Sequence, residues 1–186
     1  MRAVSDLLTR QAALQAEART VLASLAPLGP LDPTGSFVSG LMMWKELDVM
    51  RLTHPAFSPY DVLDLLRRAV DLPGVTGLSY ADERGSRSPT GERRDERYHL
   101  GLALGDWRID LSLWLYDDHA HVTAFHETLR DGLTPEQRLT ILRIKDVWHR
   151  RPEYPEEVSG FEIYTAVLDH GVRSPSEFGA WLASRS

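Results

Sequence analysis

The sequence contains no cysteine, which excludes disulfide bonds, thiolate metal sites and cysteine nucleophiles. It also lacks an apolar run of transmembrane length, and charged residues interrupt the N-terminal stretch MRAVSDLLTRQAALQAEAR. Neither a membrane span nor a signal peptide is therefore expected. There is no P-loop, no Rossmann glycine pattern, no G-x-S-x-G and no zinc motif. Together these absences predict a cytoplasmic protein with no membrane partner.

Positive charge is also in short supply. The formal net charge is −6 and the isoelectric point is near 5.6. Because bulk electrostatics supplies most non-specific nucleic-acid binding, a nucleic-acid partner is unlikely from composition, and a small or cationic partner fits better. The 186 residues are enough to bury a substantial core.

The order of apolar patterns and turn signals predicts an α+β fold. Helical spacing runs over 4–26, alternation begins at Glu46, and Ser58-Pro59-Tyr60-Asp61 has the form of a helix start. Further strands are predicted over 75–81, 98–104 and 107–115, and helices over 134–151, 157–170 and 174–182. We expect a small mixed sheet flanked by helices over residues 1–118 and a helical region over residues 119–186.

Acidic side chains gather on one side of two predicted strands. In the first, Glu46 and Asp48 alternate with apolar residues, and in the second Asp110 alternates with the apolar positions of WRIDLSLW. Residues i and i+2 of a strand lie on the same face, so each strand offers carboxylates on the face away from its apolar residues. If the strands are neighbours, three acids converge.

Three close carboxylates repel one another unless cations neutralise them. Carboxylate oxygens are hard ligands that suit Mg²⁺, and Mg²⁺ usually binds through one or two carboxylates together with substrate phosphates. Two such ions are able to stabilise both the attacking and the leaving oxygen of a phosphoryl displacement.

The chain resembles the nucleotidyltransferase superfamily, with its polymerase-β-like fold and its antibiotic nucleotidyltransferases. The resemblance covers residues 28–116 and rests on Gly35-Ser36, a short spacer, the acid-x-acid strand Glu46-Leu47-Asp48, and Asp110. It implies that Gly35 and Ser36 hold a nucleoside triphosphate, and that Glu46, Asp48 and Asp110 are catalytic ligands of two Mg²⁺ ions. Glu46 is a departure, since aspartate is commoner there, and the spacer Leu41–Trp44 is unusually apolar.

Lys145 stands within an apolar helical stripe of the C-terminal half. A lysine on a buried face is costly unless it meets an anion, and the resemblance suggests that it reaches the triphosphate. The alternative is that its stem packs while its ammonium reaches water. The spacing of His119, His121 and His126 is a weak metal signal, and the polar stretch 82–96 is either a mobile lid or a solvated connection.

The resemblance thus implies an Mg²⁺-dependent enzyme that moves a nucleoside monophosphate from a nucleoside triphosphate to a hydroxyl of a small molecule and releases pyrophosphate. Two alternatives stay open. One is a nucleotidyltransferase toxin acting on tRNA or protein, and the other is a non-catalytic nucleotide-binding module with the same fold.

Overall fold

The computed structural model describes residues 2–88, 96–116, 120–155 and 157–185. By the contacts among its Cα atoms the chain divides into two compact units. The sheet unit comprises Gln15–Gly40 and Lys45–Arg130, and the helical unit comprises Met1–Leu14, Leu41–Trp44 and Asp131–Ser186. We expected one division, at 118/119; by these contacts residues 120–130 group with the sheet, and two earlier segments group with the C-terminal helices.

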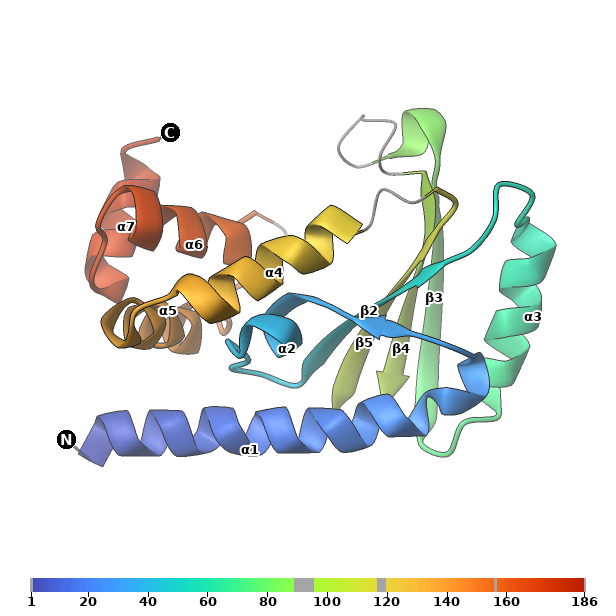
Figure 1. The fold of residues 1–186 in the computed structure, drawn as a ribbon, viewed down its shortest axis with the longest axis horizontal. Coiled ribbons are helices and arrows are strands. Elements are labelled where there is room, and N and C mark those ends of the chain that lie inside the picture. The colour runs from blue at the N-terminus through green and yellow to red at the C-terminus, as the bar shows by residue number, and fades with distance from the viewer. Residues whose placement is uncertain (1, 89–95, 117–119, 156, 186) are drawn as a thin grey trace. The chain divides into compact units, whose positions relative to one another are not determined.

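The sheet unit is built on five strands in the order β1-β2-β5-β4-β3 (Figure 1). Their bounds are β1 Asp32–Pro33, β2 Glu46–Leu52, β3 Val75–Glu83, β4 Arg97–Leu104 and β5 Trp107–Trp114. β2 runs parallel to β5, whereas the other pairs are antiparallel, so the sheet is mixed as predicted. The short strand β1 was not predicted.

Helices flank this sheet. α1 spans Arg2–Ser24 and continues into a short 3-10 turn at Ala26–Leu28, α2 spans Gly35–Ser39, α3 Pro59–Val70 and α4 Ala120–Gly132. The predicted start of α3 is confirmed: Ser58 and Asp61 form a reciprocal capping box, with proline in the first turn. α3 runs beside β3 (Figure 1) and buries Val62, Leu65 and Ala69.

Strand alternation gives the sheet two unlike faces. Leu47, Ile109 and Leu100 are buried on the face that takes the apolar residues. The other face of β3 and β4 carries small or polar residues that are largely exposed or half-buried. The apolar face anchors the strands, which leaves the polar face open for chemistry.

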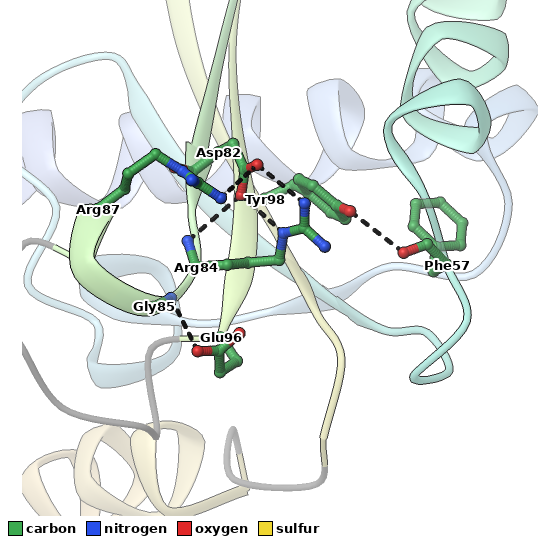
Figure 2. A network of polar contacts seen from close by, with 7 residues as sticks. All are labelled: Phe57, Asp82, Arg84, Gly85, Arg87, Glu96 and Tyr98. Atoms are coloured by element: carbon green, nitrogen blue, oxygen red, sulfur yellow. Dashed lines mark hydrogen bonds and ion pairs between the residues drawn. The ribbon is translucent and has the colours of Figure 1, made fainter.

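An ion-pair network lies where β3 ends and β4 begins (Figure 2). Asp82 contacts the guanidinium of Arg84 at 2.7 Å and that of Arg87 at 2.8 Å. Arg84 also lies 4.5 Å from the ring centroid of Tyr98, whose hydroxyl donates to the Phe57 carbonyl. Hydrogen bonding from Arg84 is the main reason that the pKa of Asp82 falls to about 2. The network fixes this end of the hairpin on the face opposite to Asp110.

The helical unit contains α5 Pro135–Trp148, α6 Gly160–Asp169 and α7 Pro175–Ala183. These three helices are N-capped by Thr134, Ser159 and Ser174, each of which accepts a backbone hydrogen bond. Leu41, Met42 and Met43 are buried and belong to this unit, although they precede β2 in the sequence. The apolar spacer is therefore explained as core of the helical unit. Among the described residues no helix is both long enough and apolar enough to cross a membrane.

Candidate functional site

Parallel pairing of β2 and β5 places the three predicted acids on one face of the sheet. Asp48 is the direct register partner of Asp110, and Glu46 is that of Arg108. Side chains of directly opposed residues point to the same face, and neighbouring strands lie about 5 Å apart. The prediction that two strands bring these carboxylates together is therefore matched by the register.

Gly35 sits directly against the Asp48 carboxylate. A Cβ added at Gly35 would lie 2.1 Å from Asp48 Oδ2, closer than any real contact, and the φ of Gly35 is +61°. The Thr34 N–H donates to the Asp48 carbonyl at 3.0 Å, which fixes the segment against β2. Glycine at position 35 is thus required both by its backbone conformation and by the approach of Asp48.

Thr34 adds a second observation beside Asp48. Its side chain is 5% exposed, and in the described part of the chain its buried Oγ1 has no hydrogen-bond partner. A buried hydroxyl without a hydrogen-bond partner costs free energy in this arrangement. Sequence reasoning did not single out Thr34, because nothing in its spacing distinguishes it from a turn residue.

Arg108 and His99 both contact Asp110 in the structure. Arg108 Nε lies 3.0 Å from Asp110 Oδ2 and 3.7 Å from Glu46 Oε1, and His99 Nε2 lies 3.4 Å from Asp110 Oδ1. Burial raises the pKa of Asp110, but the hydrogen bond from His99 and the charge of Arg108 outweigh it, so the net shift is downward. Asp110 therefore remains a carboxylate at neutral pH. His99 lies diagonally opposite Asp110 in the β4–β5 hairpin. This register could have been predicted from the Gly105-Asp106 turn in the sequence.

The donor set fits Mg²⁺ in kind, since Glu46, Asp48 and Asp110 offer only hard carboxylate oxygens. Gly35 leaves room at Asp48 that a side chain would fill. As the side chains stand, no group of three or more acidic or histidine residues in the described ranges is arranged as a metal cluster. Arg108 supplies the positive charge beside Asp110 in this arrangement.

The remaining candidates are placed as follows. Ser36 follows Gly35 within α2. Lys145 is completely buried in the helical unit, where its Nζ lies 3.2 Å from the Tyr164 hydroxyl and 4.8 Å from the ring centroid of Trp44. Its predicted contact with a triphosphate stays a prediction. His121 and His126 lie on α4 at an exposed and a half-buried position, and His119 falls outside the described residues, as do residues 89–95 of the polar stretch.

Solved structures that resemble the chain include poly(U) and poly(A) polymerases. The Cid1 poly(U) polymerase bound to MgATP matches with a TM-score of 0.54 and 14% identity over 90% of this chain and 51% of its own. A cytoplasmic RNA terminal U-transferase matches with a TM-score of 0.54 and 18% identity over 86% and 47%. The chain has a nucleotidyltransferase-like fold.

The non-canonical poly(A) polymerase GLD-2, in complex with GLD-3, matches similarly, with a TM-score of 0.52 and 13% identity over 88% of this chain and 52% of its own. The chain thus spans about half the length of these polymerases. At these identities the likeness concerns the fold. No model of a protein family matches the sequence, and no curated protein matches it. The expected fold class is confirmed.

Proposed function

We propose that this chain transfers a nucleoside monophosphate from a nucleoside triphosphate to a hydroxyl group and releases pyrophosphate. The observation that carries the proposal is the register of β2 and β5, which sets Asp48 opposite Asp110 on the open face of the sheet. The close approach of Gly35 to Asp48 and the nucleotidyltransferase-like fold support it.

Glu46 and Asp48 would hold two Mg²⁺ ions, and Asp110 would complete the site of the ion nearer to the acceptor. When bound, these ions neutralise phosphate charge and lower the pKa of the acceptor hydroxyl. The lowered pKa of Asp110 suits a ligand that stays ionised rather than a group that carries a proton. Gly35 and Ser36 would hold the triphosphate.

The acceptor we propose is a small hydroxylated molecule, as the acidic net charge of the chain favours. A second candidate is the terminal hydroxyl of an RNA, because one of the similar structures is an RNA terminal U-transferase and others are poly(U) and poly(A) polymerases.

Binding is tested first by thermal unfolding with and without Mg²⁺ and each of the four nucleoside triphosphates. A ligand at 100 times its dissociation constant stabilises by about 2.7 kcal/mol, which corresponds to roughly 5–10 °C in a chain of this size. An Mg²⁺-independent result with all four nucleotides would refute the proposal.

Turnover is tested by pyrophosphate release, with Asp48→Asn as the variant and Asp64→Asn, an exposed acid on α3, as the matched control. Asp48→Asn should abolish release and Asp64→Asn should preserve it. Mg²⁺-dependent nucleotide binding without release for any acceptor would identify a non-catalytic nucleotide-binding module.

A further inference from the structure

A hollow opens on the polar face of the sheet next to Asp110. Its volume is about 550 Å³, and its lining includes Gly77, Ser79, Gly101, Ala103, Arg108 and Asp110. Ligand pockets of small molecules span about 300–1,000 Å³, so the hollow has room for one molecule of nucleoside or sugar size.

The hollow exists because β3 and β4 carry very small side chains along this face. A Cβ added at Gly101 would come within 2.5 Å of Ser79 Oγ, and one added at Gly77 within 3.4 Å of Ala103 Cβ. Gly101 is also the register partner of Asp110, so the floor begins directly beside that carboxylate. A larger residue at any of these positions would raise the floor.

The charges around the hollow discriminate between acceptors. Asp106 and Asp110 line it together with one arginine, Arg108. The nearby Lys45 is already paired, at 2.9 Å with Asp106 and at 2.7 Å with Glu17. A single-stranded nucleic acid needs a positively charged groove along its backbone, and its phosphates would meet carboxylates here.

We propose that this hollow is the acceptor site, and that it takes a neutral or cationic hydroxylated small molecule whose reacting hydroxyl lies beside Asp110. The inference rests on the proposed function and adds the place and the chemical class of the acceptor. Asp106 and Asp110 are paired with Lys45 and Arg108, but each carboxylate has further oxygen lone pairs that accept hydrogen bonds from hydroxyl or ammonium groups of such a molecule.

In the reaction, the acceptor oxygen forms a bond to the α-phosphorus while the bond from that phosphorus to the bridging oxygen breaks. Pyrophosphate leaves with the electron pair of the broken bond, and the hydroxyl proton passes to solvent. The floor of small residues orients the acceptor, and Asp110 marks the end at which its hydroxyl reacts.

The test compares Ala103→Trp with Ala81→Trp. Both alanines are exposed on the same sheet, but only Ala103 lines the hollow. Wild type and both variants are assayed for Mg²⁺-dependent nucleotide binding by thermal shift, and for pyrophosphate release with two sets of acceptors. The first set comprises monosaccharides, nucleosides and aminoglycosides, and the second comprises oligoadenylate and oligouridylate RNA.

We expect release with a member of the small-molecule set, with its KM raised about tenfold or more by Ala103→Trp and unchanged by Ala81→Trp. The Mg²⁺-dependent nucleotide shift should be the same in all three proteins. Transfer only to RNA, or an equal KM in both variants, would overturn the inference while the proposed transfer stands. Nucleotide binding without transfer to any acceptor would refute the proposed transfer, and the inference with it. Loss of the nucleotide shift in wild type would instead refute the proposed function, and the inference with it.

Discussion

Replacing Gly35 by alanine tests whether the contact between Gly35 and Asp48 serves nucleotide binding or only the local fold. The added Cβ would lie 2.1 Å from Asp48 Oδ2, whereas ordinary contact begins at 3.4 Å. The carboxylate must therefore move by more than about 1 Å, a misplacement that costs an active site on the order of 100-fold in rate. Gly85→Ala is the matched control, because Gly85 has a φ of +57° and nothing within 4 Å of an added Cβ.

Both substitutions place a side chain in the left-handed region of the backbone. That costs about 1–2 kcal/mol, which lowers Tm by roughly 2–8 °C in a chain of this size. Gly85→Ala should show this loss of stability alone. Gly35→Ala should show it together with at least about tenfold weaker Mg²⁺-dependent nucleotide binding and about 100-fold slower pyrophosphate release.

The measurements are Tm in EDTA, titration of nucleotide in Mg²⁺, and initial rates of pyrophosphate release for both variants. EDTA separates the cost of the backbone conformation from that of the ligand. Nucleotide affinity in Gly35→Ala equal to that in Gly85→Ala would show that the carboxylate of Asp48 does not need its observed position, and the reasoning from the glycine would fail.

Three further outcomes are expected. The pKa of Asp82 is lowered to about 2, so its ionised carboxylate stabilises the fold above the ordinary value of 3.8 and ceases to do so as the pH falls toward 2. Because Asp82 and Arg84 are partly hydrated, Asp82→Asn should cost about 1 kcal/mol at pH 7. If the Tm of the variant stays parallel to that of wild type between pH 4 and pH 2, this expectation is contradicted. Arg108→Gln removes a half-exposed cation from Asp110 and should tighten Mn²⁺ binding about two- to fivefold by electron paramagnetic resonance, whereas weaker Mn²⁺ binding would show that Arg108 does not compete with the ion. Lys145→Met replaces a fully buried ammonium by a side chain of similar size, so Tm should hold or rise; a fall in Tm of several degrees would show that the contact of Nζ with the Tyr164 hydroxyl stabilises the fold.

Local patterns were enough to predict most of the sheet. Alternation placed Glu46, Asp48 and Asp110 on the correct sides of their strands, and the Gly105-Asp106 turn located the hairpin. The start of α3 followed from Ser58 and Asp61, whose interaction is local in the chain. These features depend on residues a few positions apart, which is the range over which periodicity and capping act.

Contacts between distant segments were not predictable in the same way. The ion pair between Arg108 and Glu46 depends on which strands are neighbours. Nothing in the sequence near Leu41–Trp44 shows that these residues pack with helices that follow Asp131. The burial of Leu41, Met42 and Met43 explains why they are apolar. From the sequence alone, the same residues could equally have lined a pocket.

That short apolar segment also has a bearing on how the two units are connected along the chain. Leu41, Met42 and Met43 are held in the core of the helical unit, and the strand that carries Glu46 and Asp48 begins three residues later. The chain leaves the sheet unit after Gly40 and returns to it at Lys45. A truncation after Arg130 would therefore keep all three acids of the site but remove the helices that belong to the same unit as these apolar side chains. No single cut in the chain separates the two units.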